Sequence, residues 1–264
     1  MLTLYHNDIS VCAAKVRTAL AEKWLDCNLI HLDLRAGDTQ KPEYLKLNPN
    51  AVVPTLVHDD RVFIESTVIC EYIDDEWPGP PLKPPDSVGR ARMRLWTKQL
   101  DEGLHAAVGS LSFAIAFRHQ WLARSTEDRG KWLAGIPQPD RRERLASLLD
   151  LGLESPYFAP AAKRYAKVFD DFEIALEQGP WLTGEHFSLA EVGYAPCLAR
   201  LRHLGFDLLF ERRPCVADWA NRVAQRPSVV SGVERWFNPK YLTLFEEQQP
   251  TAKPIIARLL SATA

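Results

Sequence analysis

Long hydrophobic runs are absent from this sequence of 264 residues, and none approaches the roughly 20 apolar residues needed to cross a bilayer. Residues 1–5 carry neither the basic start nor the apolar core of a secretory leader. The formal net charge of -2 provides no overall attraction for nucleic acid or for an anionic membrane. We therefore expect a cytoplasmic protein with no membrane or nucleic-acid partner.

Cysteine is scarce, and its spacing is irregular. The five cysteines form no Cys-x-x-Cys pair and no zinc-binding pattern, and their odd number argues against a complete set of disulfides. They are Cys12, Cys27, Cys70, Cys197 and Cys215. A reducing cytosol is the simplest environment for such a chain, and no metal site is expected.

Strand-like and helix-like segments alternate over residues 1–77, which predicts a small α/β domain. The expected strands are 2–5, 28–34, 54–57 and 62–64, and the expected helices are 11–23, 42–47 and 66–76. Five prolines then fall within eight positions, which no helix or strand interior tolerates, so residues 78–87 are predicted to be a linker.

Residues 88–264 predict an all-α domain, because almost every periodic segment has helical spacing. The expected helices are 88–117, 141–151, 160–177, 189–204 and 216–225. The stretch 118–157 is rich in charge, proline and glycine, and we expect it to be an elaborated connection between helices.

Three short features in the first domain point to a binding site. Ser10 lies where the first strand hands over to a helix, Val53-Pro54 precedes the third strand, and Glu65-Ser66 precedes the third helix. Each alone fits a structural role: a helix N-cap, an edge-strand proline, and a carboxylate at a positive helix end. Ser188 to Glu191 is best explained as a capping box.

Taken together, these features resemble a known family. The run from Asn48 to Leu56 and the run from Glu65 to Tyr72 resemble the core signature of the cytosolic glutathione transferases. The second run and residues 92–98 are also similar to the bacterial group that includes the lignin β-etherases. The resemblance implies a thioredoxin-like domain followed by a helical domain, a two-fold homodimer, and glutathione as co-substrate.

The resemblance also implies roles for individual residues. Ser10 would donate its hydroxyl to the glutathione thiolate, and a cis Pro54 would leave the Val53 backbone free to pair with the cysteinyl unit. Glu65 would meet the γ-glutamyl ammonium and Ser66 its carboxylate. The glycyl carboxylate would need a donor near Gln40 or Lys41. Val52 departs from the Lys or Gln of many relatives, and this removes one donor; Glu191 replaces the usual capping Asp.

The second substrate is expected between the two domains, against the first long helix. Four of its side chains share one face and could line an aromatic pocket, or they could be plain core: Trp96, Leu100, Leu104 and Val108. Aromatic residues continue this character into the next segment: Phe113, Phe117, Trp121 and Trp132. Residues 118–157 could enlarge the wall of that pocket or merely cover the outer face of the helical domain.

Other interpretations stay open at this point. Cys12 lies on the first turn of the same helix as Ser10 and could be the nucleophile of a glutathione-dependent thiol–disulfide reductase, or a packing residue. A non-catalytic binding or scaffold module is a further alternative. His6 and Asp8 are expected to be solvated loop residues, or either could touch a co-substrate. Asp101 and Glu102 could reach the glutathione of a neighbouring subunit or form a solvated face.

Overall fold

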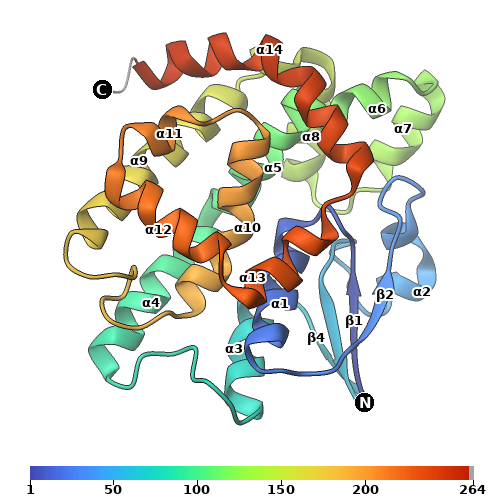
Figure 1. The fold of residues 1–264 in the computed structure, drawn as a ribbon. Helices are drawn as coiled ribbons and strands as arrows, with labels where there is room; N and C mark the ends of the chain where they lie inside the picture. Colours follow the sequence, from blue (N-terminus) through green and yellow to red (C-terminus); the bar gives the residue numbers. More distant parts are fainter. Residues whose placement is uncertain (262–264) are drawn as a thin grey trace.

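A four-stranded sheet forms the core of the N-terminal part of the computed structural model, which describes residues 1–261 (Figure 1). The strands are β1 (Leu2–His6), β2 (Asn28–His31), β3 (Thr55–His58) and β4 (Arg61–Phe63). They lie in the order β2-β1-β3-β4, with β1 parallel to β2 and antiparallel to β3, and with β3 antiparallel to β4. Leu4 pairs with Leu56 in the register of β1 and β3, and both side chains are fully buried.

Short helices connect and cover these strands. They are α1 (Val11–Glu22), the 3-10 turn η1 (Asp38–Gln40), α2 (Pro42–Leu45) and α3 (Ser66–Glu76). Helices α1 and α3 contact each other, and α3 buries Ile69 and Ile73 completely. Apolar residues at helical spacing in α1 and α3 and alternating ones in β1 therefore meet in one core, as the sequence pattern predicts. The thioredoxin-like fold expected for this part is confirmed.

From residue 77 to residue 261 the regular elements are helices, which confirms the all-α architecture expected after the linker. The elements are α4 (Ser87–Gln99), η2 (Leu100–Leu104), α5 (His105–Ser112), η3 (Phe113–Phe117), α6 (Arg118–Leu122), α7 (Thr126–Ala134), α8 (Pro139–Leu151), η4 (Gly152–Glu154), α9 (Phe158–Leu176), α10 (Leu189–His203), α11 (Leu208–Glu211), α12 (Pro214–Ala224), α13 (Pro227–Gly232), η5 (Glu234–Trp236) and α14 (Pro239–Ser261). No helix within residues 1–261 is long and apolar enough to cross a membrane.

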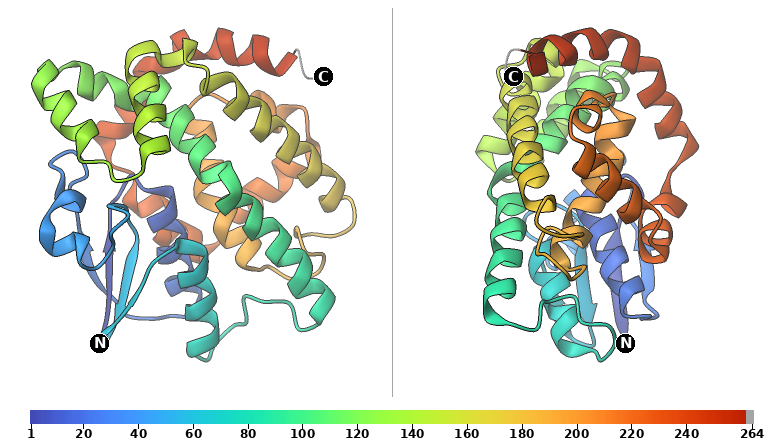
Figure 2. Two further views of the ribbon diagram at one scale, coloured as in Figure 1. Left: turned by 180° about the vertical axis from the view of Figure 1, so that it is seen from behind. Right: turned by 60° about the vertical axis from the view of Figure 1, so that its left-hand side comes forward.

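Some of these helices were not predicted from the sequence. The longest is α14, which contains Pro250 and Pro254 and lies across the end of the molecule opposite the N-terminus (Figures 1 and 2). Proline inside a helix removes a backbone donor and argues against a helix in a single-sequence reading. Burial of Phe245, Ala252 and Ile256 against the helical core outweighs that local cost.

The single long helix expected over residues 88–117 is interrupted in the structure. Gly103 has a φ of 136°, a conformation that suits glycine, and Glu102 also leaves the helical region. The Arg164 side chain packs against Gly103 and donates a hydrogen bond of 2.7 Å to the Glu102 carbonyl. The break means that one face of α4 does not continue as the same face of α5.

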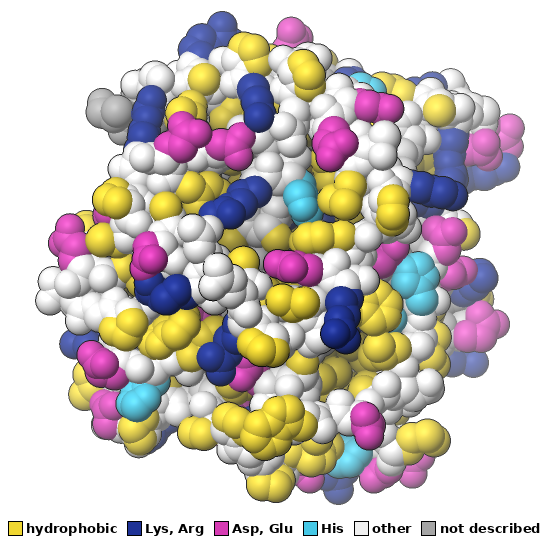
Figure 3. Space-filling view, in the orientation of Figure 1, with side chains coloured by type: hydrophobic (Ala, Val, Ile, Leu, Met, Phe, Trp, Pro, Cys, Tyr) yellow, Lys and Arg dark blue, Asp and Glu magenta, His cyan; other side chains and the backbone are white. Residues whose placement is uncertain are grey.

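Helix α1 joins the sheet-bearing part to the helical part. Arg17 Nε donates to the Gly232 carbonyl of α13 at 2.9 Å, and Arg226 Nη2 donates to Glu22 Oε2 at 2.8 Å. These buried contacts fix the helix that begins just after Ser10 against the helical body. On the face seen in Figure 3, acidic and basic side chains are intermingled, and neither sign of charge dominates.

Candidate active site

A cavity of about 500 Å³ lies between the sheet-bearing part and the helices. Its walls come from the segment that ends at Cys12, the segment before β3, the start of α3, and α5, η3 and α8. Seven of the residues predicted for the site line it: Ser10, Gln40, Val53, Pro54, Glu65, Ser66 and Val108. Features far apart in the sequence therefore face one space, of a size that suits small-molecule ligands.

Ser10 is the N-cap of α1. Its side-chain oxygen accepts a hydrogen bond of 3.2 Å from the Ala13 amide, which satisfies one of the unpaired donors at the helix start. Because the oxygen acts as the acceptor in that bond, the hydroxyl proton is free to be donated into the cavity. The partial positive charge of the helix N-terminus also favours an anion at this position.

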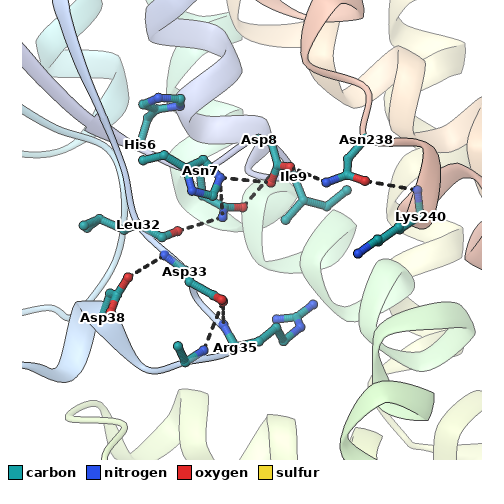
Figure 4. Close-up of polar contacts among 12 residues, drawn as sticks. His6, Asn7, Asp8, Ile9, Leu32, Asp33, Arg35, Asp38, Asn238 and Lys240 are labelled. Carbon is teal, nitrogen blue, oxygen red and sulfur yellow. Dashed lines mark hydrogen bonds and ion pairs between the residues drawn. The ribbon is translucent and has the colours of Figure 1, made fainter.

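The loop before Ser10 is held by a network of polar contacts (Figure 4). Asn7 Nδ2 donates to the Leu32 carbonyl at 2.8 Å, and Asp8 Oδ1 accepts the Ile9 amide at 2.8 Å. Asn238, which precedes α14, donates to Asp8 Oδ2 at 2.9 Å. The loop that carries Ser10 is thus tied both to the segment after β2 and to the C-terminal part of the chain.

Two predicted loop residues are less exposed than expected. His6 is 1% exposed and lies edge-on to Trp236, and Arg17 Nη1 contacts its Nδ1 at 3.1 Å. Burial, with the nearby Arg17 charge, lowers the pKa of His6 to about 4. The expectation that His6 and Asp8 are solvated is therefore corrected, because the C-terminal segment covers this loop.

Val53 and Pro54 form the wall beside the start of β3. The peptide bond between them is cis. Within residues 1–261, neither the amide nor the carbonyl of Val53 takes part in a hydrogen bond. The two backbone groups can therefore pair with an extended ligand that lies along them.

Glu65 and Ser66 occupy the N-terminus of α3. Glu65 has a φ of 66°, a strained conformation for a residue with a side chain, and such strain is often found at functional sites. Its Oε1 accepts a weak hydrogen bond of 3.4 Å from Asn50 Nδ2. Ser66 is buried and presents a hydroxyl at the helix end. The pair offers an anion site and a carboxylate side by side.

A second acidic residue completes this end of the cavity. Thr67 Oγ1 accepts from Lys15 Nζ at 2.7 Å and donates to Asp101 Oδ1 at 2.8 Å. Asp101 lines the cavity, whereas Glu102 pairs with Lys98 on the surface. The Lys15–Thr67 chain holds the Asp101 carboxylate beside α3.

Gln40 and Lys41, the two residues expected near the glycyl carboxylate of glutathione, differ in whether they line the cavity. Gln40 lines the cavity, but its amide donates to the Trp132 carbonyl at 3.3 Å. Lys41 lies outside the cavity and pairs with Asp38 at 2.7 Å. The structure therefore brings Gln40 to the cavity, whereas the well-exposed Lys41 lines a different surface pocket.

The pocket expected on the first long helix is only partly where the sequence placed it. Val108 lines the cavity, but Trp96, Leu100 and Leu104 do not. Trp96 packs against Phe172 and Tyr194, and both leucines are fully buried. These three residues belong to the core, because the break at Gly103 separates their face from that of α5.

Aromatic side chains further along do line the cavity: Phe113, Phe117 and Trp132. Phe113 stacks on Trp132 with ring centroids 5.7 Å apart, and Trp132 stacks on Trp121 at 4.0 Å. The segment 118–157 therefore forms part of the cavity wall. It also contacts the sheet-bearing part, since Gln138 Nε2 donates to the Asn50 carbonyl at 3.1 Å.

Cys12 lines the cavity but is poorly suited to ionise. Burial raises the pKa of its thiol above the ordinary value, and this effect outweighs the opposing charge of Lys15. All five cysteines are free thiols. The arrangement therefore favours a protonated, unreactive Cys12 at neutral pH.

Four arginines that were not predicted for the site line the cavity: Arg35, Arg141, Arg144 and Arg200. The basic run 141–144 is expected from the sequence to be a solvated helix face, but two of its arginines line the cavity. The four arginines come from the segment after β2, from α8 and from α10. Arg141 and Arg144 are spaced i,i+3, which places them on one helix face, but no local motif marks Arg35 or Arg200. Glu65 and Asp101 are the acidic residues of the same lining, so the cavity is rich in positive charge.

Comparison with known proteins agrees with this geometry. The model of the glutathione S-transferase N-terminal domain matches residues 4–81, and that of the C-terminal domain matches residues 120–222. The chain belongs to the glutathione S-transferase family. It is 29% identical over 231 residues to glutathione S-transferase 3 of Zea mays, covering 86% of this chain and 90% of the maize protein.

Two further relatives span most of the chain. Protein LigF of Sphingobium sp. strain SYK-6 is 27% identical over 241 residues, covering 89% of this chain and 93% of that protein. The crystal structure of beta-etherase LigF superposes with a TM-score of 0.79 at 26% identity, covering 89% of this chain and 99% of LigF. The stringent starvation protein A homolog of Haemophilus influenzae is 26% identical over 233 residues, covering 88% of this chain and 90% of that protein.

Proposed function

We propose that this family member transfers the thiolate of glutathione to a hydrophobic, aromatic electrophile, by conjugation or by cleavage of an aryl ether. The observation that carries the proposal is the shared cavity. It brings the Ser10 hydroxyl, the unpaired Val53 backbone and the Glu65-Ser66 pair opposite the aromatic wall that begins at Phe113. A thiolate donor and an aromatic acceptor would meet in this space.

Glutathione fits the polar side of the cavity as an extended chain. Its cysteinyl backbone would pair with Val53, which would place the sulfur near Ser10 at the positive end of α1. The γ-glutamyl ammonium would meet the carboxylates of Glu65 and Asp101, and its carboxylate would accept hydrogen bonds from Ser66. Each of these groups lines the cavity.

Arginines of α8 offer further donors for a glutathione carboxylate. Arg141 and Arg144 form no hydrogen bond or ion pair within residues 1–261, and both face the cavity. Gln138, one turn before Arg141, bonds Asn50, which in turn bonds Glu65. The start of α8 therefore lies over the Glu65 end, where the γ-glutamyl group is proposed to bind.

The chemistry follows from holding the sulfur as an anion. A free thiol has a pKa of about 8.5, so only a small fraction is ionised at neutral pH. The Ser10 hydroxyl and the α1 dipole would lower that pKa without ionisation of the serine itself. The thiolate then attacks an electrophilic carbon, a C–S bond forms, and the leaving group departs with the electron pair of the broken bond.

An aromatic electrophile is supported by the wall and by one relative. Phe113, Phe117 and Trp132 provide the stacking surface, and aromatic rings pair favourably on such walls. LigF, a beta-etherase by name, resembles this chain over most of both lengths. Aryl ethers are therefore included among the proposed substrates beside aryl halides.

The alternatives have weaker support. A reductase that uses Cys12 would need a thiolate at that position, and burial acts against its ionisation. A scaffold protein does not need a cavity that is lined by the Ser10 hydroxyl, the unpaired backbone groups of Val53 and a strained Glu65. One relative is named a stringent starvation protein rather than a transferase, so the scaffold alternative is retained for testing.

We further propose how the chain is organised. Residues 1–77 would form the glutathione-binding unit, 78–87 the linker, and 88–264 the unit for the second substrate. A cytoplasmic homodimer involved in detoxification is consistent with five free cysteines and with exposed apolar side chains on β4, α3 and α4. These are Val62, Val68, Val88 and Leu95, which are 42%, 56%, 59% and 64% exposed.

One set of assays tests the proposed function. We expect glutathione-dependent turnover of a chromogenic aryl halide and no more than trace reduction of a mixed disulfide of glutathione. Reduction that depends on Cys12 would favour the reductase. Failure to bind glutathione in calorimetry, together with no turnover of aryl halides, aryl ethers, epoxides or disulfides, would favour the scaffold.

A further inference from the structure

Two arginines flank Phe117 at the end of the cavity near Ser10. The guanidinium carbons of Arg35 and Arg200 lie 4.9 and 5.4 Å from the centroid of the Phe117 ring. Arg35 comes from the segment after β2 and Arg200 from α10, and both line the cavity. Arg200 Nη2 donates to the carbonyl of Ile9 at 2.7 Å, so its charge lies close to the residue before Ser10.

Neither guanidinium has a carboxylate partner within residues 1–261. Arg200 is 8% exposed; its Nη1 donates to Ser112 Oγ at 3.1 Å, and its buried Nε has no partner. Arg35 Nε donates to Gln120 Oε1 at 2.7 Å, and its buried Nη2 has no partner. Within the same residues Arg35 Nη1 makes no hydrogen bond, and each Nη atom of Arg200 donates only one of its two N–H groups, so both guanidinium groups keep donors for a ligand in the cavity.

This lack of counter-charge is unusual for buried arginines. Leaving a buried charge unpaired is costly, and buried guanidinium groups are normally compensated by a carboxylate. Elsewhere in this chain, the less buried Arg226 and Arg213 pair with Glu22 and Asp170. The buried Arg17 also lacks a carboxylate partner in the described residues, but it donates to the carbonyls of Gly232 and Asn7. Burial, together with the nearby positive charge of Arg35, lowers the pKa of Arg200 to about 10. Because this value is still well above 7, Arg200 remains charged at neutral pH.

The γ-glutamyl group of glutathione does not account for this end of the cavity, and its glycyl carboxylate is expected at Gln40, which also lines the cavity. Its ammonium and γ-glutamyl carboxylate are proposed to bind at the opposite end, where Glu65, Ser66 and Arg141 lie. Arg35, Arg200, Phe117 and Ser10 all line the same cavity, and both guanidinium groups lie against the Phe117 ring. A planar aromatic group can stack in this space while an anionic substituent accepts from the free N–H groups.

We infer that the second substrate is an aromatic electrophile with a carboxylate, which Arg35 and Arg200 bind beside Phe117. The inference rests on the proposed transferase function and narrows its substrate class. A guanidinium fork matches the planar geometry of a carboxylate, and charge-assisted hydrogen bonds of this kind are strong. With the carboxylate fixed there, the reactive carbon of the ring is presented to the thiolate at Ser10.

A matched pair of substrates tests the inference: 4-chloro-3,5-dinitrobenzoate and its neutral primary amide. In both, the glutathione thiolate forms a C–S bond with the carbon that bears chlorine, the C–Cl bond breaks, and chloride leaves with the electron pair. The thiol proton passes to solvent. The ring and the leaving group are identical, but the amide activates the ring more strongly than the carboxylate does. Each kcat/KM is therefore divided by the rate constant of the uncatalysed reaction with glutathione, and the ratio of the two normalised values isolates recognition of the carboxylate.

We expect the parent enzyme to favour the benzoate over the amide by about ten- to a hundredfold. In Arg35→Gln, which removes the charge but leaves the Arg200 contacts to Ile9 and Ser112 intact, that ratio should fall towards one. The matched control is Arg124→Gln. This arginine stacks on Trp121 outside the cavity, and its loss should leave the ratio unchanged.

Binding of the two S-aryl glutathione products, measured by calorimetry, provides a readout that does not depend on turnover. The carboxylate product should bind more tightly to the parent, and this advantage should be lost in Arg35→Gln. Turnover of both compounds without a carboxylate preference would overturn the inference while leaving the transferase function in place. If Arg35→Gln weakened the binding of both products equally, and of glutathione itself, the arginine would be assigned to glutathione. This result would also overturn the inference. Absence of glutathione binding and of all turnover in the parent would refute the proposed function itself.

Discussion

The side-chain amide of Asn238 donates a 2.9 Å hydrogen bond to the carboxylate of Asp8, across 230 positions of sequence. Asp8 lies two residues before Ser10, and its other oxygen accepts the Ile9 amide. The segment that leads into α14 therefore helps to position the loop that carries Ser10. A residue of the helical part thus acts on the site through the loop, without lining the large cavity itself.

Removal of this contact should destabilise the protein and disturb the site. Because the bond involves a charged acceptor, Asn238→Ala should lower the free energy of unfolding by about 1.5–3 kcal/mol, measured by urea denaturation. Transferase activity should fall at the same time. Asn221→Ala is the control, since Asn221 bonds Arg202 on the exposed surface and its loss should have a much smaller effect. Equal effects of the two changes would contradict the positioning role.

Glutathione affinity should depend on Ser66. Loss of a hydrogen bond to the γ-glutamyl carboxylate should cost about 1.5–3 kcal/mol, so Ser66→Ala should weaken binding by roughly one to two decades in calorimetry. Ser87→Ala, at the exposed start of α4, is the matched control and should bind as the parent does. Unchanged affinity in Ser66→Ala would refute the assignment.

Ser10 should lower the pKa of the bound thiol. In Ser10→Ala, we expect the ultraviolet absorbance of the thiolate to titrate about one to two pH units higher. The same change removes the N-cap of α1, so Ser10→Thr, which keeps a capping oxygen and a hydroxyl proton, is the control and should titrate near the parent. Full activity of Ser10→Ala combined with loss of activity in Cys12→Ala would favour the reductase alternative.

Stability should decrease in mildly acidic solution. Burial, with the nearby Arg200 charge, lowers the pKa of His203 to about 4, and His6 is lowered to a similar value. Between about pH 6.5 and 4 the unfolded chain binds protons that the native protein excludes, so the free energy of unfolding falls as the pH falls. Urea denaturation at several pH values should show this slope.

Substitution of one histidine should reduce that slope. His203 lies between Phe237 and Phe245, so His203→Phe removes the titrating group while keeping an aromatic ring there. We expect a shallower dependence on pH, with the remainder due to His6. His186→Gln, at an exposed position, should keep the parent slope. If the free energy of unfolding of His203→Phe depended on pH as steeply as that of the parent, the role given to His203 would be contradicted.

The proposed homodimer predicts a mass of twice 29.9 kDa in light scattering at micromolar concentrations. Leu95 is 64% exposed on α4, so Leu95→Glu should place a charge in an apolar interface and shift the protein towards the monomer. The control is Ile174→Glu on α9, which is equally exposed but is not part of the proposed interface on β4, α3 and α4. A monomer in the parent would end the dimer proposal.

Local patterns in the sequence were sufficient to identify one side of the site. Ser10, Val53-Pro54 and Glu65-Ser66 each lie where a strand or helix begins, and the rules for such boundaries depend on a few neighbouring residues. The capping box of Ser188 and Glu191 is present for the same reason, with Glu191 Oε2 accepting from the Ser188 amide at 2.9 Å. The expected alternation of strands and helices likewise follows from short-range periodicity.

The other side of the cavity was decided by tertiary structure. Trp96 and Val108 share a predicted helical face, yet Trp96 packs in the core and Val108 lines the cavity. The reason is that the helix is interrupted at Gly103. Arg35 and Arg200 are 165 positions apart and carry no local signal, and they meet at Phe117 only when the helices pack on the sheet. Periodicity indicates that a residue has a buried face, but packing determines which neighbour that face meets.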